Sequence, residues 1–161
     1  MVYKGSMTLQ PGFWLDVLEL VCRAMVYKGS MTLQQAIARQ EGFGQPKTLA
    51  TCNHNPGNII SGTVAFMYGA IGSVYGYAIF PSDEAGWAAL TSLLSAPSYA
   101  GLTVFQAINK YCPPPNGSVL TNGNDPDVYV ENVCSWLGCS PDTPIAGLLG
   151  TANEQPKAQK P

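Results

Sequence analysis

Glu41 and the amide-rich turn after it are the residues of this chain best suited to chemistry. Glu41 ends a helical pattern in Ala38-Arg39-Gln40-Glu41-Gly42-Phe43-Gly44, and Asn53-His54-Asn55-Pro56-Gly57-Asn58 follows within one short loop. A carboxyl group beside an apolar wall, here Phe43, can stay protonated near neutral pH and act as an acid. Neighbouring amides can hold an uncharged, hydroxyl-rich ligand. The combination indicates sugar chemistry.

Glycoside cleavage needs an acid for the leaving oxygen and a group that stabilises the oxocarbenium-like centre, often a second carboxylate. Most other acids after residue 30 have a structural explanation. Helix starts explain Asp83, Glu84, Asp125 and Asp127, a turn explains Asp142, a solvated helix face explains Glu131, and Glu154 lies in the tail. Glu41 has the fewest such explanations, although an isolated glutamate near a helix end is usually solvated and Asn-Pro-Gly is also a common structural turn.

Histidine and cysteine do not indicate a second kind of site. His54 is the single histidine, and with no obvious partner it is more typical of a surface or core position than of catalysis. The five cysteines contain no C-x-x-C pair, which argues against zinc. They are either free thiols or form one or two disulfides in an exported protein, with the pairing open. We expect no metal and no cofactor.

The composition excludes several partner classes. The 161 residues are 46% hydrophobic, so we expect one packed domain, but only 11% are charged, against about 25% in a typical protein. A net charge of −2 argues against a nucleic-acid binder. No stretch reaches the ~18 apolar residues of a membrane span. We expect a monomer whose ligand is read by hydrogen bonds.

The decapeptide Met1–Gln10 recurs without change as Met25–Gln34. Structural repeats diverge, so this copy indicates a recent duplication, an artefact or a misplaced start. We therefore expect an appendage over 1–30, a catalytic domain over 31–150 and a disordered tail over 151–161. The alternative is that Phe13–Ala24, a short amphipathic pattern, forms a genuine N-terminal helix on the domain.

The local patterns predict four helices and one small sheet. Thr32 caps a helix that Gly42 and Gly44 end, and Ser82, Thr103 and Asp125 cap three more, which end at Pro97, before Pro113 and at Gly138. Residues 45–62 and 113–125 have loop composition. The glycine-interrupted, β-rich segment 63–80 predicts an irregular hairpin or sheet. Together these elements make an α+β fold.

An ordered series of segments resembles a known family. Ala36-Ile37-Ala38-Arg39-Gln40-Glu41-Gly42-Phe43 followed by Asn53-His54-Asn55-Pro56-Gly57-Asn58-Ile59 is similar to the E-G-F segment and N-N-P-G-N-[LI] turn of the lysozyme-like domain in bacterial and phage wall-degrading proteins. The later segments that agree are Ala78–Ser82, Glu84–Leu90, Asn109–Pro114, Tyr129, Leu137-Gly138 and Thr143-Pro144. The resemblance covers roughly residues 32–146.

The resemblance implies a lysozyme-like fold, mainly helical, with a small irregular β-sheet beside an active-site cleft. It implies cleavage of the MurNAc-β-1,4-GlcNAc bond of peptidoglycan glycan strands by a lytic transglycosylase or a lysozyme. Glu41 would be the catalytic acid, and Asn55, Asn58, Tyr111 and Tyr129 would bind substrate. The chain departs from the family pattern at His54, where Asn is commoner, and in an inserted loop over Gly117–Gly123.

Two questions of mechanism and role stay open. The lack of a partner carboxylate favours a reaction in which the substrate's N-acetyl group stabilises the cation and the MurNAc 6-hydroxyl closes a 1,6-anhydro ring; hydrolysis by water is the close alternative. A non-catalytic wall-binding or virion structural module is the rival function. A wall enzyme acts in the periplasm, outside the cell or with a phage, yet no clear signal peptide is present.

Overall fold

The computed structural model describes residues 31–113 and 125–151 of the chain. The chain divides into two units between Ser30 and Met31, and every described residue belongs to the second unit. The first decapeptide copy, the helix expected over Phe13–Ala24, the inserted loop and the tail beyond residue 151 lie outside the described residues. Those expectations stay predictions.

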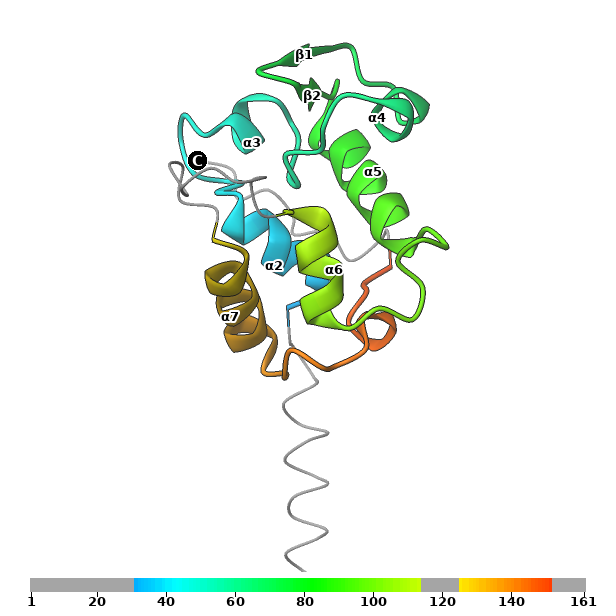
Figure 1. The fold of residues 1–161 in the computed structure, drawn as a ribbon. Helices are drawn as coiled ribbons and strands as arrows, with labels where there is room; N and C mark the ends of the chain where they lie inside the picture. The colour runs from blue at the N-terminus through cyan, green and yellow to red at the C-terminus, as the bar shows by residue number, and fades with distance from the viewer. Residues whose placement is uncertain (1–30, 114–124, 152–161) are drawn as a thin grey trace, which may run out of the picture. The chain divides into compact units, whose positions relative to one another are not determined.

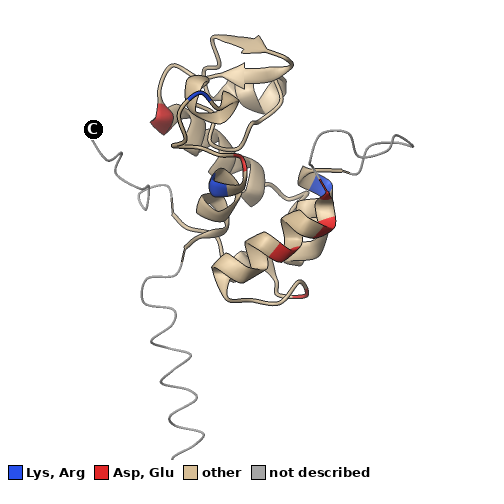
Figure 2. Cartoon of the chain, turned by 90° about the vertical axis from the view of Figure 1, so that its left-hand side faces the viewer, with Lys and Arg blue, Asp and Glu red and all other residues tan. Residues whose placement is uncertain are grey.

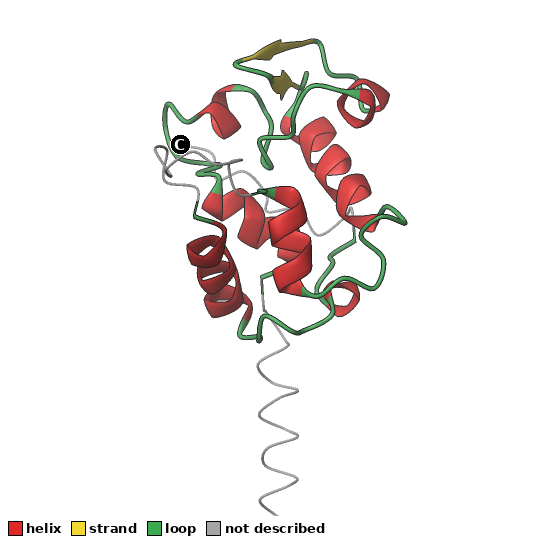
Figure 3. Cartoon of the chain, viewed as in Figure 1, coloured by secondary structure: helices red, strands yellow, loops and turns green. Residues whose placement is uncertain are grey.

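Helices dominate the described residues and accompany one small antiparallel hairpin (Figures 1 and 3). Strands β1 (Gly72–Val74) and β2 (Tyr77–Ile79) pair Gly72 with Ile79 and Val74 with Tyr77. The helices are α2 (Leu33–Gln40), α3 (Leu49–Cys52), α4 (Thr63–Met67), α5 (Asp83–Ser95), α6 (Val104–Tyr111), α7 (Pro126–Leu137) and a short 3₁₀ helix, η1 (Ile145–Gly147). The α+β class is confirmed.

Thr32 caps helix α2, as the sequence predicts. The Thr32 hydroxyl accepts from the Gln35 backbone N–H at 3.3 Å, and the Gln35 side chain accepts from the Thr32 N–H at 2.9 Å, which makes a capping box. Five of the helix's eight residues are buried. Among them, Gln34 exchanges two 3.0 Å hydrogen bonds with the backbone of Gly150, so its amide ties the end of the domain to α2.

The starts and ends of the three longer helices also agree with their local patterns. Ser82 caps α5, Thr103 caps α6 and Asp125 caps α7, each by accepting a backbone N–H from the first turn. Gly138 ends α7 in the left-handed conformation, with φ of 64°, which glycine adopts at little cost. These helices were therefore predictable from their ends.

Two predictions about the segments between helices are wrong. Residues 45–62 are not loop throughout, because Thr48 caps the short helix α3. The first part of the β-rich segment 63–80 is the helix α4, although Val64 and Phe66 favour a strand. In the helical conformation Ala65 is fully buried and α4 packs on α5, so tertiary packing overrides the local preference.

The helices pack around α2, which contacts both α7 and α5. Helix α6 packs on α7, and α4 packs on α5. The hairpin and α4 lie near the N-terminal end of α5 (Figure 1). The core contains fully buried side chains from all these parts, among them Ile37, Phe80, Leu90 and Ile108. This packing brings the C-terminal end of α2, where Glu41 lies, between the hairpin region and the α6–α7 pair.

The hairpin region carries no charge and exposes several large apolar side chains. Residues 48–82 contain no Lys, Arg, Asp or Glu, and Figure 2 shows the hairpin without charged residues. The exposed side chains are Ile60, Phe66, Met67, Ile71 and Tyr75. Within the described ranges, no helix has the length and apolar character needed to cross a membrane. The four cysteines in those ranges, Cys52, Cys112, Cys134 and Cys139, are free thiols.

Candidate active site

Glu41 is the first residue after α2 and its backbone is fixed. Its N–H donates to the Ile37 carbonyl at 2.9 Å, and Gly42 then turns the chain with φ of 77°. A side chain at position 42 would press on Thr48, whose hydroxyl donates to the Gly42 carbonyl at 2.9 Å. The helix end and this glycine turn therefore set the direction in which the Glu41 side chain leaves the backbone.

Each oxygen of the Glu41 carboxylate has one hydrogen-bond donor. The Asn58 side-chain amide donates to Oε2 at 2.8 Å, and the Tyr129 hydroxyl donates to Oε1 at 2.9 Å. Tyr129 comes from α7 and is almost fully buried, so the packing of α2 on α7 brings together residues 88 positions apart. The structure thus assembles three of the predicted site residues around one carboxylate.

The surroundings of Glu41 change its acidity. Burial raises the pKa of the Glu41 carboxyl above its ordinary value of 4.5, while the hydrogen bonds from Asn58 and Tyr129 act in the opposite direction. Burial and the negative charge of Glu41 hold the pKa of the Tyr129 and Tyr111 hydroxyls well above their ordinary value. Both tyrosines therefore stay neutral donors over the range in which Glu41 titrates.

Phe43, which we expected beside the carboxylate, packs edge-on against Trp87 with ring centroids 5.6 Å apart. The side chains that bind the carboxylate oxygens are polar, from Asn58 and Tyr129. Burial at the end of α2 raises the pKa of Glu41, and Phe43 packs against the core at α5.

Asn55 corrects the predicted set of substrate-binding residues. Its side chain is fully buried. The amide nitrogen donates to the carbonyls of Ile59 and Ala78, both at 2.9 Å, and the amide oxygen accepts the Ile59 N–H at 2.8 Å. With no exposed surface and both ends of the amide bound, Asn55 cannot contact a substrate directly. It fixes the turn that carries Asn58 and joins it to β2.

The same turn is anchored to the start of α5. His54 Nδ1 lies 2.7 Å from Asp83 Oδ1, a partner that the sequence does not indicate, and its exposed side chain agrees with the predicted surface position. Both side chains are substantially exposed, and a pair of this kind contributes about 0–1 kcal/mol. Gly86 of α5 packs directly against the backbone of this turn. A Cβ at position 86 would therefore collide with the His54 carbonyl oxygen and with Pro56.

Replacing Gly86 by alanine tests this close approach. In an ordinary helix the change stabilises by about 1 kcal/mol, but here the added methyl group meets backbone, and we expect a loss of about 1–3 kcal/mol. Urea denaturation followed by circular dichroism measures the difference. Gly147→Ala is the matched control, since its Cβ would enter open space. Equal stability of the two variants would contradict the predicted packing.

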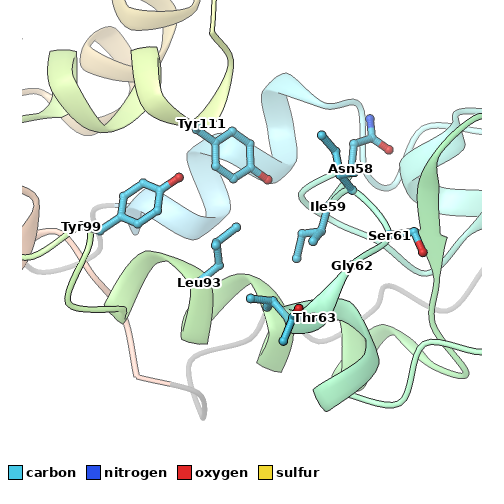
Figure 4. A pocket seen from close by; sticks show the side chains of 10 residues that line it. Asn58, Ile59, Ser61, Gly62, Thr63, Leu93, Tyr99 and Tyr111 are labelled. Carbon is cyan, nitrogen blue, oxygen red and sulfur yellow. The ribbon is translucent and has the colours of Figure 1, made fainter.

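A pocket of about 350 Å³ opens beside Asn58 (Figure 4). It is lined by residues 58–64 together with Leu93, Tyr99 and Tyr111. The Tyr111 hydroxyl donates to the Gly57 carbonyl and so holds the turn from the α6 side. Glu41 does not line this pocket itself; Asn58 both lines it and binds the carboxylate. Asn58 is therefore the residue that the pocket and the carboxylate share.

Sequence reasoning missed part of this pocket. Tyr99 and Leu93 carry no motif, and Tyr99 lies in the connection between α5 and α6. The one available signal was a tyrosine in a short interhelical loop, where aromatic side chains often cover a core or a ligand. The Lys110 ammonium lies 5.1 Å from the centre of the Tyr99 ring and donates to the Ser98 carbonyl, which fixes this corner of the pocket.

The remaining acids of the described residues lie at other places. Asp83 pairs with His54, and Asp125 caps α7. Asp127, Glu131 and Asp142 are exposed. Glu84 hydrogen-bonds with Ser82 at the start of α5. In the described ranges, moreover, no group of three or more His, Cys, Asp or Glu side chains could hold a metal ion. The chemistry available to this site is thus that of one part-buried carboxyl group with two neutral donors.

Compared with models of known families, with curated proteins and with solved structures, the chain gives no match. Function therefore has to be inferred from the site itself. The feature that most needs explanation is the part-buried Glu41 with its raised pKa, because burying a carboxyl group costs stability and carboxyl groups with perturbed pKa values gather at functional sites.

Proposed function

We propose that residues 31–150 form a lysozyme-like module that cleaves the MurNAc-β-1,4-GlcNAc bond of peptidoglycan, with Glu41 as its single catalytic carboxyl group. One observation carries the proposal: a carboxyl group with a raised pKa is held at both oxygens beside an open pocket. A general acid for glycoside cleavage needs this combination of retained proton, fixed geometry and access.

The pocket suits a neutral, hydroxyl-rich ligand. Its lining combines backbone of residues 58–64, the hydroxyls of Ser61 and Thr63, and two tyrosines. The region carries no formal charge between residues 48 and 82, so binding there would depend on hydrogen bonds and on sugar faces packing against apolar and aromatic side chains. In this proposal Tyr111 and Asn58 contact the glycan, while Asn55 only shapes the turn.

The proposed reaction has two proton transfers. Glu41 first donates its proton to the glycosidic oxygen, the C1–O bond breaks, and the N-acetyl group of MurNAc stabilises the resulting cation. The Glu41 carboxylate then removes a proton from the MurNAc 6-hydroxyl, whose oxygen bonds to C1 and closes a 1,6-anhydro ring. If water takes the place of that hydroxyl, the same two steps give hydrolysis.

Digestion of purified peptidoglycan, followed by mass spectrometry, tests the proposal and separates the two outcomes. We expect soluble fragments ending in 1,6-anhydro-MurNAc, which are one water lighter than hydrolytic fragments, because Glu41 has no carboxylate partner among the described residues to direct a water. Fragments of the heavier mass would make the protein a hydrolase. Binding to peptidoglycan without any release of fragments would contradict catalysis and support a wall-binding module.

A further inference from the structure

Two asparagines of the same turn hold their amides in opposite ways. In Asn55, both the nitrogen and the oxygen of the side chain are hydrogen-bonded. Turning that amide over would place donors against donors and acceptors against acceptors. In Asn58, the nitrogen donates to Glu41 Oε2 at 2.8 Å, whereas the buried oxygen has no hydrogen-bond partner in the described structure. Only one end of the Asn58 amide is therefore fixed.

The fixed end of Asn58 faces the one group of the site that changes its hydrogen-bonding character. An ionised Glu41 carboxylate only accepts hydrogen bonds, and the observed orientation of Asn58 supplies it with a donor. A protonated Glu41 carries an O–H, and against that proton the amide nitrogen would set donor against donor. The amide oxygen, turned toward Glu41, would accept it. The turn breaks no bond at the far end, because none is made there.

Tyr129 determines which carboxyl oxygen takes the proton. Its hydroxyl donates to Oε1, and Oε1 can accept that bond in either form of Glu41. The proton then belongs on Oε2, the oxygen that faces Asn58. The other titratable groups whose charges couple to Glu41 are Tyr111, Tyr129 and Cys112, and each has a pKa raised above its ordinary value. Glu41 is therefore the group of this cluster that changes charge below neutral pH.

We propose that Asn58 is a positioning residue whose side-chain amide turns over with the proton of Glu41, donating to the carboxylate and accepting from the acid. Its catalytic meaning rests on the proposed function, in which Glu41 passes through both forms in every turnover. With a partner in both forms, the carboxyl group keeps one orientation through donation and removal of the proton. A donor fixed in place would favour the ionised form alone.

Nuclear magnetic resonance of the whole chain, with the Glu41 side-chain carboxyl carbon followed against pH, tests this role without an activity assay. Tyr129→Phe removes a donor to the carboxylate and is expected to raise the pKa of Glu41. In its observed orientation Asn58 lowers that pKa, so an amide fixed in this orientation would make Asn58→Leu raise the pKa as Tyr129→Phe does. An amide that turns is a partner of both forms, so Asn58→Leu, which also keeps water out, is expected to leave the pKa nearly unchanged. Because Asn58 has φ of 45°, Asn58→Gly serves as the second variant that the backbone accepts without strain.

The wild-type protein gives a direct reading of the amide. A nuclear Overhauser contact between the Asn58 side-chain amide protons and the Glu41 Hγ protons is expected above the pKa of Glu41 and lost below it. The Asn55 amide, bound at both ends, is the internal control and keeps its contacts at both pH values. Either of two results would overturn the proposal. One is that the Asn58 contact persists at low pH. The other is that the pKa of Glu41 rises in both position-58 variants by as much as it does in Tyr129→Phe.

The two proposals fail separately. A protein whose amide turns as expected, but which releases no fragments from peptidoglycan, contradicts the proposed function and leaves the role of Asn58 in place. A protein that cleaves peptidoglycan, but whose Asn58 contact persists at low pH, contradicts the role of Asn58 alone. Circular dichroism of each variant shows that the fold is kept before either result is interpreted.

Discussion

Replacing Glu41 by glutamine is expected to lower the rate of peptidoglycan cleavage by roughly 10²–10⁴-fold, the usual cost of losing a general acid. Glutamine has nearly the same size and can keep the local geometry. Its carbonyl oxygen can accept the hydrogen bond that Tyr129 now donates, and the Asn58 amide oxygen, turned toward position 41, can accept from its nitrogen. What disappears is the transferable proton. Release of soluble fragments per unit time measures the effect.

The same substitution is expected to stabilise the protein at pH 7. Burial raises the pKa of Glu41 in the folded state above its ordinary value of 4.5. The contribution of Glu41 to stability is therefore largest below pH 4.5 and is lost as pH rises through the raised value. Glutamine does not ionise, so the variant avoids this loss. A gain on the order of 1 kcal/mol is typical for a relieved functional site, and it should vanish below pH 4.5.

Glu131→Gln is the matched control, because Glu131 is an exposed glutamate on α7, the helix that carries Tyr129. Glu131→Gln should leave the cleavage rate unchanged. Its free energy of unfolding should change by no more than about 0.5 kcal/mol, as for an ordinary surface substitution. Full lytic activity of Glu41→Gln would remove Glu41 from catalysis. A variant less stable than wild type at pH 7 would show that the ionised carboxylate is stabilised in the fold, contrary to the direction of its pKa.

The helices were predictable where a few residues at the ends of each helix determine where it starts and stops. Thr32 and Thr103 begin their helices by local hydrogen bonds, and Gly138 ends one through its own backbone conformation. Helix α4 was not predictable in this way. Its β-branched and aromatic residues favour a strand in isolation, and the burial of Ala65 against α5 decides the conformation. That contact joins distant parts of the chain, so no local window contains it.

Which residues meet at the candidate site was predictable only in part. Glu41 could be singled out because the other acids had structural roles, and the positions of Asn58 and Tyr129 followed from a family resemblance. Sequence could not distinguish Asn58, which faces the carboxyl group, from Asn55, whose amide faces the backbone. Both are polar residues of one turn. The direction of each side chain depends on where β2 and α2 pack, which only the folded chain determines.

Asn55→Asp is expected to destabilise the fold by about 4 kcal/mol or more at pH 7, the largest effect on stability that the site offers. The substitution changes one NH₂ group to an oxygen. In the fully buried position 55, that oxygen would face the carbonyl oxygens of Ile59 and Ala78, each now 2.9 Å from the amide nitrogen. Two hydrogen bonds are lost, and a negative charge is buried without a cation. Because globular domains have only about 5–15 kcal/mol of stability, much of the reserve would be lost.

The pH dependence of this variant follows from the same geometry. Burial without a donor raises the pKa of an aspartate, so the folded variant holds its proton to higher pH than the unfolded chain. Its stability relative to wild type should therefore improve as pH falls, since the protonated carboxyl group of the variant can donate to one of the two carbonyls. Asn109→Asp is the matched control. Asn109 donates to a single carbonyl, that of Phe105, at a partly exposed site on α6, where water can solvate the new charge. Urea denaturation of both variants at pH 4 and pH 7 makes the comparison. Similar losses at the two positions would mean that Asn55 does not hold the turn by its buried amide, and Asn58 would then need another explanation for its place beside Glu41.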